Sequence, residues 1–500
     1  MLQLKQLLSE PSWGLMKKSL QKLPRDLPNT FQEYLSRLGD PSLSSRAHMA
    51  WKALTWLTFT RESLDPERLQ EALSIQPESK GPDPDFVPSM SCILECCLGL
   101  VVIDEHANTV RLVHFSLQEY LETHLRTIYP IGLEEIALDC YTYCSYQGFS
   151  NGPCANDESI LARLDQYPLM GYFAEHWRFH TLACSESPRV QGAVINFMSS
   201  DPHRTSHRQM SRFVAGYRES YYAAEEAAST HTLHMLASLG HTEIFKQALN
   251  LHMDKINLRT AIVGHTPIIT AASAGHVEVT RHLLHHGADP LIPNWYGNAM
   301  HCAAEANKAS IIILLLEAGM NPDTRTAGGT TPLACTTDND AADAAAVLLS
   351  HGADPMAIDS KREPNLLFAA VQDHCPRLVS LVLSRQCVDI EAVGGYFGLT
   401  ALRAATILLD VELILLLVKA TTDAAAAEFS RRVATIVQKL STTRRDGIGM
   451  QLWEIRKRGE GWKAVEDKIL GLLEDAERAG QFADLSTEDC KGGAMDIDEV

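Results

Sequence analysis

The sequence has no apolar run long enough to cross a membrane. Its longest apolar stretches, near Ile311 to Leu316 and Ile407 to Val418, fall short of the roughly 20 residues that a spanning helix needs. The first residues mix Lys, Gln, Glu and Ser, with no continuous apolar segment and no small-residue cleavage site, so no secretory signal is expected. These absences predict no membrane partner and a cytoplasmic location, with the nucleus as an alternative.

Positive charge is scarce as well. Lys and Arg number 44 against 62 Asp and Glu, which gives a formal net charge of −18. Nucleic-acid binding depends on clustered cations at the phosphates, so the sequence argues against a nucleic-acid partner. The 12 cysteines include no Cys-x-x-Cys pair and are expected to be reduced core residues of an intracellular protein.

Catalytic signatures are missing too. No His-Glu-x-x-His motif is present, and the sequence indicates no nucleophile with a neighbouring base. We therefore expect a protein that is not an enzyme, holds no cofactor or metal, and has no small-molecule ligand. Protein partners are the remaining expectation.

What the sequence does contain is one pattern that returns six times between about residues 230 and 420. Aligned on a position that resembles Thr-Pro, the copies begin at His231, Thr266, Asn298, Thr331, Pro364 and Thr400. A paired apolar site follows 17 and 18 residues later in the copies, at Ala248-Leu249, Leu283-Leu284, Leu315-Leu316, Leu348-Leu349, Leu381-Val382 and Leu417-Val418. A register held this closely predicts a repeat architecture.

Each part of the pattern has a physical role. Thr or Asn at the start caps a helix, because its side-chain oxygen accepts a free backbone N–H, and Pro is tolerated in the first turn. Small pairs such as Ala271-Ala272 keep the first helix narrow, and the apolar pair gives the second helix a buried ridge. Gly287, Gly319 and Gly352 are expected to follow the second helices in left-handed conformation. One unit cannot bury its apolar face alone, so stability must come from stacking.

Two strings in these copies identify a family. Thr266-Pro267-Ile268 and Met300-His301-Cys302-Ala303 resemble the Thr-Pro-Leu-His-x-Ala signature of ankyrin repeats. The resemblance implies six repeats over residues 229–422 and protein partners on the concave edge of the stack. His265, His276 and His301 fall at positions of the repeat where a bond to a neighbouring loop is expected.

Residues 46–128 have another organisation, which predicts a winged-helix module. Apolar spacing favours three helices, at Ala47 to Phe59, after Leu64-Asp65 and through Ile93 to Leu98. Two β-branched runs, 100–104 and 109–114, flank a turn-prone segment and indicate a small hairpin. A closing helix is expected from Leu117 to Leu125. Acidic side chains dominate these helices, so a DNA-binding role is not expected.

The same region resembles the winged-helix module of fungal NACHT–ankyrin signalling proteins. The strings that carry the likeness are Trp51 to Leu57, Glu67 to Leu73, Cys97 to Val102 and Val110 to Tyr120. Segments around Leu23 to Leu27, Ile136 to Tyr141 and Tyr167 to His180 resemble the lid before that module and the helical spacer after it. NACHT proteins bind nucleotide through a loop that ends in Gly-Lys-Ser or Gly-Lys-Thr, and no Gly-Lys pair occurs here. The chain therefore resembles the C-terminal half of such a protein, as a natural short form or as a truncated gene model.

Together these patterns predict a mainly α protein. We expect a winged-helix module with one small β-hairpin, a helical spacer, and an α-solenoid of ankyrin repeats. The expected divisions are 1–45 (helical lid remnant), 46–128 (winged helix), 129–228 (spacer), 229–422 (six repeats), 423–482 (C-terminal helices) and 483–500 (acidic disordered tail).

The strongest binding candidates are the turn tips of the repeats, where two residues precede the turn glycine. These pairs are Ile262-Val263, Trp295-Tyr296, Ala327-Gly328, Ser360-Lys361 and Tyr396-Phe397. Exposed aromatic residues have little reason to lie at such tips unless they bind, because Trp and Tyr are enriched at interface hot spots. The alternative for Trp295 is that it folds back onto its own repeat.

Two further candidate sites, a nucleotide-sensing residue and a metal site, each have a purely structural alternative. Val113-His114-Phe115 resembles the winged-helix motif of signalling NTPases whose His contacts nucleotide, with Phe where Asp is common. The alternative for His114 is a residue that ends a strand and packs under the next helix. A second candidate is a metal site, because one-turn spacings could place ligands on helix faces, although aromatic neighbours favour core packing. The six candidate ligands are Cys140, Cys144, Cys154, His176, His180 and Cys184.

The function that we expect from the sequence is non-enzymatic protein–protein interaction, as a scaffold or adaptor in fungal NACHT-type signalling. The alternative is the regulatory half of a nucleotide-driven switch whose NTPase domain is missing or supplied by another chain.

Overall fold

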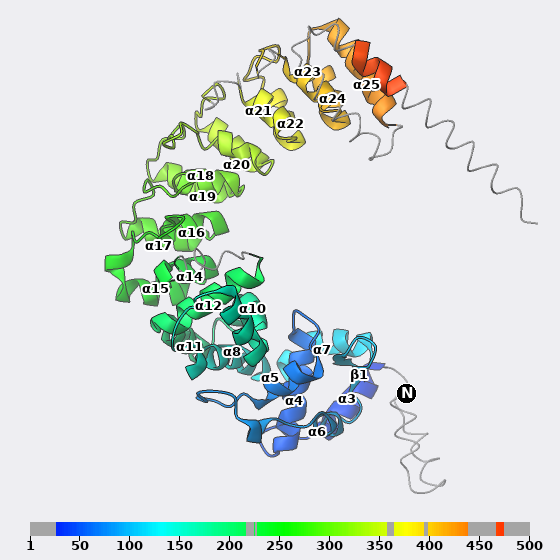
Figure 1. Cartoon of the computed structure of the whole chain (residues 1–500), viewed down its shortest axis with the longest axis vertical. Helices are drawn as coiled ribbons and strands as arrows, with labels where there is room; N and C mark the ends of the chain where they lie inside the picture. The colour runs from blue at the N-terminus through cyan, green and yellow to red at the C-terminus, as the bar shows by residue number, and fades with distance from the viewer. Residues whose placement is uncertain are drawn as a thin grey trace, which may run out of the picture. The chain divides into compact units, whose positions relative to one another are not determined.

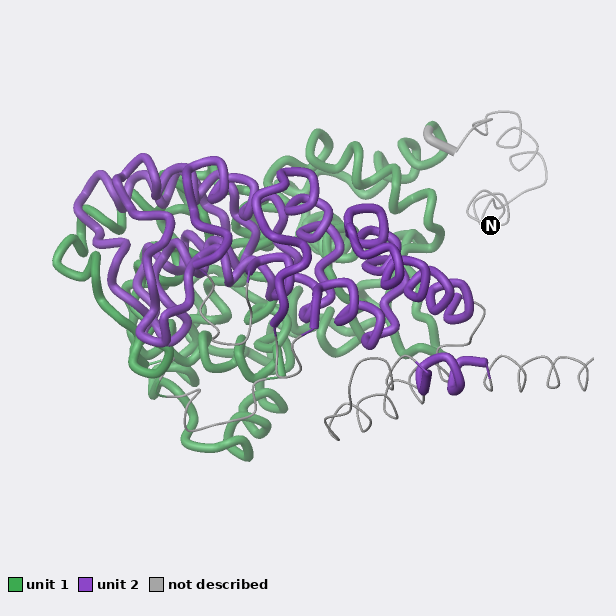
Figure 2. The backbone as a smooth tube through the Cα atoms, turned by 90° about the horizontal axis from the view of Figure 1, so that it is seen from above, with its two compact units in different colours: residues 1–263 green, residues 264–500 purple. Residues whose placement is uncertain are grey.

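The structure is a computed structural model that describes residues 27–216, 225, 228–357, 365–394, 399–438 and 467–474. The described chain is mostly helical and includes one two-stranded antiparallel sheet (Figure 1). The predicted fold class, a mainly α protein with one small hairpin and a solenoid, is confirmed. The chain divides into two compact units, residues 1–263 and 264–500, which Figure 2 colours separately.

Unit 1 begins with the winged-helix region. Side-chain caps set the helix starts: Ser44 accepts the N–H of Ala47, and Asp65 accepts the N–H of Arg68 at 2.8 Å. The hairpin pairs Val101 with Leu112 in antiparallel register. The elements are α3 (Leu27–Leu38), α4 (Ser45–Phe59), α5 (Pro66–Ser74), η1 (Pro84–Phe86), α6 (Met90–Cys96), β1 (Val101–Asp104), β2 (Thr109–Leu112) and α7 (Phe115–Ile128). The helices and hairpin predicted from the sequence are therefore present.

Helix α4 is the centre of this region. It contacts α5, α6, α7 and β2, and Leu54 and Trp56 on it are fully buried. Ten of its 15 residues are buried, including the polar Lys52, so it lacks the solvent face of an ordinary amphipathic helix. The position of α4 follows from that pattern, because a helix that is buried on most sides must be surrounded by other elements.

The described part of the spacer in unit 1 contains six further elements. Helix α8 packs against α10 and α11, and α10 packs against α12. The aromatic side chains of Tyr143, Phe149 and Phe173 are fully buried in this region. The elements are α8 (Gly132–Cys144), η2 (Gln147–Phe149), α9 (Asp157–Gln166), α10 (Leu169–Ala183), α11 (Pro188–Ser199) and α12 (Asp201–Val214).

The first repeat closes unit 1. Its two helices are α14 (Thr232–Leu239) and α15 (Thr242–Leu251), followed by the short η3 (Met253–Lys255). His231 caps α14 at the position that the repeat register predicts. Ala248 and Leu249, the predicted apolar pair, are buried.

Unit 2 consists of helix pairs that follow one another in rows (Figure 1). Neighbouring pairs contact each other through both their first and their second helices, for example α16 with α18 and α17 with α19. The elements are α16 (Pro267–Ala274), α17 (Val277–His285), α18 (Ala299–Glu305), α19 (Ala309–Glu317), η4 (Ala334–Thr337), α20 (Ala342–Ser350), α21 (Leu366–Gln372), α22 (Pro376–Arg385), α23 (Ala401–Ile407), α24 (Val411–Val418) and α25 (Ala424–Gln438).

One continuous core runs through this unit. It joins the small residues of the first helices, such as Ala303 and Ala370, to the ridge residues Leu315, Leu348 and Leu417 of the second helices. Helix α25 packs on α23 and α24, and Ile469 and Leu473 from residues 467–474 join the same core. The predicted left-handed glycines are confirmed, since Gly287, Gly319 and Gly352 have φ between +85° and +87°.

Two copies differ from the others at the start of their first helix. The copy at Thr331 forms the 3-10 turn η4 where the other described copies form an α-helix, although Thr331 Oγ1 still accepts the N–H of Ala334 at 3.3 Å at the predicted cap position. In the copy predicted to begin at Pro364, the cap is Asn365, which accepts the N–H of Phe368 at 3.0 Å. Pro364 itself lies outside the described residues.

A second regularity in unit 2 is a left-handed residue after each first helix. These residues are Gly275, Asn307, Asp340, His374 and Leu409, with φ from +49° to +84°. Two of them, Asn307 and Asp340, accept backbone N–H groups of the following repeat. Asn307 accepts the N–H of Ala344 at 2.9 Å, and Asp340 accepts the N–H groups of Arg377 and Leu378 at 3.1 and 2.8 Å.

These contacts replace caps that the helices lack. The residues at the N-caps of α20 and α22, Ala341 and Cys375, provide no side-chain hydrogen bond to their own helices. The free N–H groups of those first turns are bonded by the preceding repeat instead. For α22 the cap is also a carboxylate, which the helix dipole stabilises. Each of these second helices therefore depends on its neighbour for its first turn.

We predict that Asp340→Ala lowers the stability of the repeats by about 1 kcal/mol, the usual cost of losing a helix cap. The measurement is urea unfolding of the full chain followed by circular dichroism. Asp338→Ala is the matched control, because burial and the neighbouring Asp373 raise the pKa of Asp338 and no hydrogen bond to its carboxylate is found among the described residues. Equal destabilisation by both substitutions would contradict capping by the neighbour.

Candidate protein-binding surface

The turn tips differ in how far they are exposed. Trp295 and Tyr296 are 69% and 60% exposed, which excludes the alternative that Trp295 folds back onto its own repeat. Ala327 and Gly328 are exposed as well. In unit 1, Ile262 and Val263 are half-buried. The other predicted tip residues, Ser360, Lys361, Tyr396 and Phe397, lie outside the described residues.

The loop beneath the aromatic pair is held by one buried side chain. Asn294 Oδ1 accepts the backbone N–H groups of Tyr296 and Gly297, both at 2.8 Å. The N–H of Asn294 donates to the carbonyl of Gly297 at 2.8 Å and closes the turn. Asn294 is buried, so these bonds are protected from water. Trp295 and Tyr296 thus project from a fixed turn.

The turn is tied in addition to the following helix and the following tip. Asn298 caps α18 by accepting the N–H groups of Met300 and His301. His301 Nδ1 accepts the N–H of Asn298 at 3.3 Å, so Nε2 carries the proton and donates to the carbonyl of Thr330 at 2.9 Å. Burial lowers the pKa of His301, which keeps this neutral form.

The predicted role of His301, a bond to a neighbouring loop, is therefore confirmed. His234 in unit 1 has the same arrangement, with Nδ1 on the N–H of His231 and Nε2 on the carbonyl of Leu258 at 3.0 Å. Sequence reasoning missed His234, although its position three residues after the cap is the signal that marks His301.

Gly297 is required by this geometry. Its φ is +138°, and a Cβ at this position would lie 2.6 Å from His301 Cγ. We predict that Gly297→Ala destabilises the repeats by about 1–3 kcal/mol, the usual cost of backbone strain. Urea unfolding of the full chain measures it.

The control for that substitution is Gly328→Ala at the next tip. There the nearest atom to an added Cβ is Thr326 Oγ1 at 3.7 Å, an ordinary contact. We expect the stability of this variant to stay within about 0.5 kcal/mol of the parent chain. If both alanine variants unfolded at the same urea concentration, the packing of His301 against the turn would not be the constraint.

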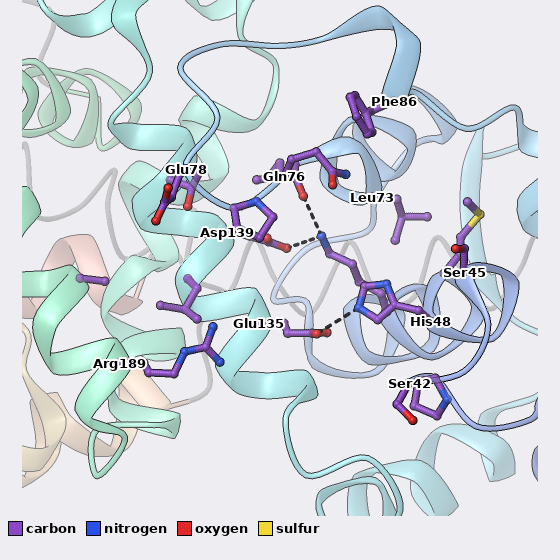
Figure 3. A pocket seen from close by; sticks show the side chains of 18 of the residues that line it. Ser42, Ser45, His48, Leu73, Gln76, Glu78, Phe86, Glu135, Asp139 and Arg189 are labelled. Carbon is purple, nitrogen blue, oxygen red and sulfur yellow. Dashed lines mark hydrogen bonds and ion pairs between the residues drawn. The ribbon is translucent and has the colours of Figure 1, made fainter.

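Unit 1 contains a cavity of about 1060 Å³ between the winged-helix region and the spacer. Figure 3 shows that α4 contributes His48 and α8 contributes Glu135 and Asp139, while Arg189 of α11 lies at the side. His48 Nε2 lies 3.0 Å from Glu135 Oε1. Lys52 Nζ lies 2.9 Å from Asp139 Oδ2 and donates to the carbonyl of Ile75 at 3.2 Å.

The Lys52–Asp139 pair is buried on both sides. Burial raises the pKa of Asp139 to about 6, although the charge of Lys52 and its hydrogen bond act in the opposite direction. Because the pKa is raised on folding, the carboxyl takes up a proton when the protein folds at pH 4 to 6. Its burial therefore costs less free energy below pH 6 than above it.

We predict that Lys52→Met destabilises unit 1 by about 3–5 kcal/mol at pH 8, because it leaves a buried carboxylate unpaired. The loss should be smaller at pH 5, where Asp139 is protonated and needs no counter-ion. Urea unfolding at the two pH values measures the difference. The double variant Lys52→Met with Asp139→Leu should recover most of the stability, and an equal loss at both pH values would contradict the assignment.

His114 begins helix α7. Its Nδ1 accepts the N–H of Ser116 at 3.1 Å and lies 2.8 Å from Ser116 Oγ, so the imidazole acts as the helix cap. The residue is exposed, and its ring lies against Phe115, which is exposed too. The alternative of packing under the next helix is therefore wrong in this respect. The nucleotide-sensor role stays a prediction.

The six Cys and His residues considered as metal ligands do not come together. Among the described residues, no three of them offer ligand atoms within 4.8 Å of one another. Cys140 and Cys144 are buried, and burial raises the pKa of both thiols, which disfavours the thiolate form that binds metal. His180 Nε2 lies 2.7 Å from the hydroxyl of Tyr172. His176 instead faces Glu62, which the sequence did not connect with it.

One catalytic-looking string escaped the sequence interpretation. Gly148 to Gly152 reads Gly-x-Ser-x-Gly, the spacing of a hydrolase nucleophile elbow. An elbow joins a strand to a helix, whereas this string follows α8 and overlaps the turn η2. Ser150 Oγ donates to the carbonyl of Gln147 at 2.7 Å, and Gly148 is required because a Cβ there would lie 2.0 Å from the Tyr167 hydroxyl. The string is therefore a structural turn.

Comparison with known families agrees with the two architectures. The sequence profile described as "GPI inositol-deacylase, winged helix domain" matches residues 42–128. The profile described as "Ankyrin repeats (3 copies)" matches residues 221–294 and 292–359. The chain thus contains a winged-helix domain of the GPI inositol-deacylase type and ankyrin repeats, and ankyrin repeats support a role in protein–protein interaction.

Individual proteins match over part of the chain. The potassium channel AKT2/3 of Arabidopsis thaliana is 28% identical over 135 residues, which are 26% of this chain and 16% of the channel. The human ASB11 ankyrin repeat domain is similar in structure with a TM-score of 0.34 and 20% identity, over 38% of this chain and 84% of that one. The ankyrin repeat domain of Bcl-3, a member of the IkappaB family, is similar in structure with a TM-score of 0.34 and 24% identity, over 39% of this chain and 87% of that one.

Among the described residues, no helix is both long and apolar enough to span a membrane.

Proposed function

We propose that the chain is a non-enzymatic scaffold or adaptor that binds a protein partner along the concave edge of its ankyrin repeats. The observation that carries this proposal is the exposed pair Trp295 and Tyr296. Large aromatic side chains gain free energy when they are buried, and Trp and Tyr are enriched among the residues that dominate interface energies. Because Trp295 and Tyr296 stay exposed in the folded chain, the free energy of burying them is available for binding a partner.

The support beneath the pair strengthens the proposal. The turn is fixed by Asn294 and by the cap at Asn298, so little backbone freedom is lost when a partner binds. A fixed aromatic pair is a suitable anchor for that reason. The other predicted tip residues, Ile262, Val263, Ser360, Lys361, Tyr396 and Phe397, are proposed as further partner contacts from their place in the repeat sequence.

We predict that the double substitution Trp295→Ala with Tyr296→Ala weakens partner binding by more than tenfold, since hot-spot truncations cost about 2 kcal/mol or more. A photo-crosslinking residue at position 295 of the full chain first identifies the partner, and calorimetry with that purified partner then compares the variants.

Leu415→Ala is the matched control for this experiment. Leu415 is an exposed apolar side chain on α24, a second helix, and its removal should leave the affinity unchanged. An unchanged affinity of the Trp295/Tyr296 variant, or an equal loss with Leu415→Ala, would contradict the proposal. Unfolding measurements on each variant separate lost binding from lost folding.

We further propose that this interaction belongs to fungal NACHT-type signalling, with the division into lid remnant, winged helix, spacer, repeats and C-terminal helices given above. The winged-helix strings Trp51 to Leu57 and Val110 to Tyr120 support this setting, together with the repeats that follow. The test is whether the partner crosslinked at position 295 copurifies with a nucleotide-binding signalling protein. Copurification with proteins of unrelated pathways alone would count against the setting and leave the interaction itself intact.

A further inference from the structure

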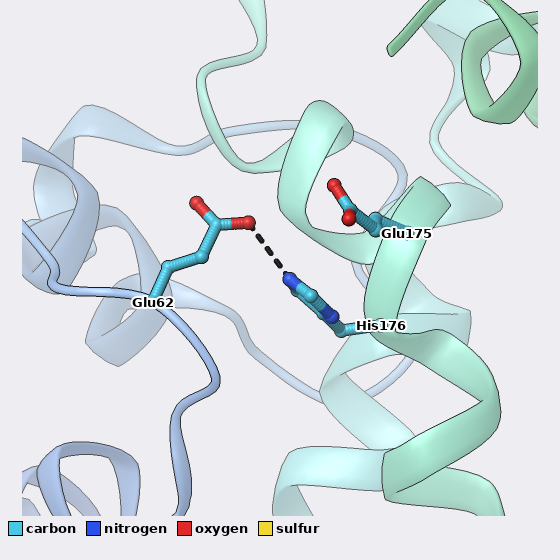
Figure 4. A group of neighbouring side chains, drawn as sticks. All are labelled: Glu62, Glu175 and His176. Carbon is cyan, nitrogen blue, oxygen red and sulfur yellow. Dashed lines mark hydrogen bonds and ion pairs between the residues drawn. The ribbon is translucent and has the colours of Figure 1, made fainter. Parts of the chain in front are cut away.

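Three metal-ligand side chains meet on unit 1, away from the repeats. Glu62 follows α4 in the winged-helix region, and Glu175 and His176 lie on α10 of the spacer. Their ligand atoms all lie within 4.8 Å of one another, and His176 Nε2 lies 2.7 Å from Glu62 Oε1. Figure 4 shows Glu62 facing the helix that carries the other two side chains.

The backbone that carries Glu62 is fixed on the same helix. The hydroxyl of Tyr172, a buried residue of α10, accepts the N–H of Arg61 at 3.3 Å and lies 3.4 Å from Thr60 Oγ1. Thr60 Oγ1 also donates to the carbonyl of Glu62 at 2.8 Å. The two segments are therefore held in register by contacts that do not use the three ligand side chains, as a preorganised site requires.

The negative charges of the two glutamates are only partly balanced by neighbouring cations. Glu62 Oε2 lies 3.7 Å from Arg68, which leaves Oε1 toward His176. Glu175 is exposed, and no ion pair to it is found in the described part of the chain. Glu62 and Glu175 place two negative charges close to one imidazole nitrogen, and a divalent cation bound to all three side chains would offset the repulsion between the carboxylates.

We propose that Glu62, Glu175 and His176 bind a zinc ion or a similar first-row divalent metal. One imidazole nitrogen with two carboxylate oxygens is a ligand set that suits zinc, whereas Mg²⁺ and Ca²⁺ take oxygen ligands alone. The metal joins the segment after α4 to α10, two parts of unit 1 that are 114 residues apart in the sequence. Three protein ligands leave the fourth position for water.

The distances allow such a site with small side-chain movements. Ligand atoms about 2.0–2.2 Å from zinc in tetrahedral geometry lie about 3.4 Å apart. The Glu62–His176 separation must therefore increase slightly as the metal replaces the shared proton, and the Glu175 carboxylate must draw closer. Glu175 is exposed and can do so by rotation of its side chain.

The test is calorimetric titration of the chelator-treated full chain with ZnCl₂, compared with Glu175→Gln and His176→Gln. We expect saturable binding of one ion that weakens at least tenfold in each variant. Glu175→Gln is the more informative change, because an exposed side chain with no ion pair can be altered without harm to folding. Circular dichroism and thermal unfolding establish that His176→Gln is folded.

Controls address the other zinc-binding side chains of the chain, which has 20 His and 12 Cys. Glu119→Gln and His124→Gln change exposed residues on α7 and should bind zinc like the parent chain. Visible absorption of bound Co²⁺ in place of zinc should show four-coordinate nitrogen and oxygen ligation that is lost in Glu175→Gln. Absence of saturable binding, equal affinity in the ligand variants, or tighter binding of Mg²⁺ or Ca²⁺ than of zinc would each overturn the proposal.

Discussion

The structure of unit 2 depends on one constraint: no repeat can bury its own apolar face. The second helices supply ridge residues such as Leu315 and Leu348, and these are buried only because the neighbouring pair covers them. The first helices must be narrow for that contact, which explains the small residues at Ala303 and Ala370. The turn tips are the part of each repeat that is not needed to bury the apolar faces of the helices. Residues at the tips can therefore be selected for binding rather than for packing, and the exposed Trp295 and Tyr296 agree with such a role.

Unit 1 is held together differently. Its winged-helix region and spacer meet through polar pairs as well as through apolar packing, with Lys52 on Asp139, His48 on Glu135 and His176 on Glu62. Of the three pairs only Lys52 with Asp139 is buried on both sides, and a buried pair adds little net stability although removing one partner is costly. They fix how α4 lies against α8 and how the following segment lies against α10. The result is a rigid contact between two parts that are far apart in the sequence.

The repeats could be predicted because their signal is local. Caps at Thr266, Asn298 and Thr400, and the ridge 17 and 18 residues later, follow from helix chemistry within one copy. The exposure of Trp295 was foreseen for the same reason. The 3-10 turn in the copy at Thr331 was not foreseen, because its cap at Thr331 matches the caps of copies that begin with an α-helix. The polar contacts of unit 1 could not be predicted, since they join residues 87 to 114 positions apart whose pairing depends on the folded arrangement.

The caps supplied by Asn307 and Asp340 make neighbouring repeats unequal partners. Each provides hydrogen-bond acceptors to the next repeat in the chain direction, so the repeat that follows is incomplete without the one before it. A repeat copied or moved to another position would carry a helix whose first turn has lost its acceptors. Insertions and deletions in this region are therefore best tolerated when a capping repeat and the repeat that it caps are kept or removed as a pair. The stack thus has a direction that its repeated sequence alone does not show.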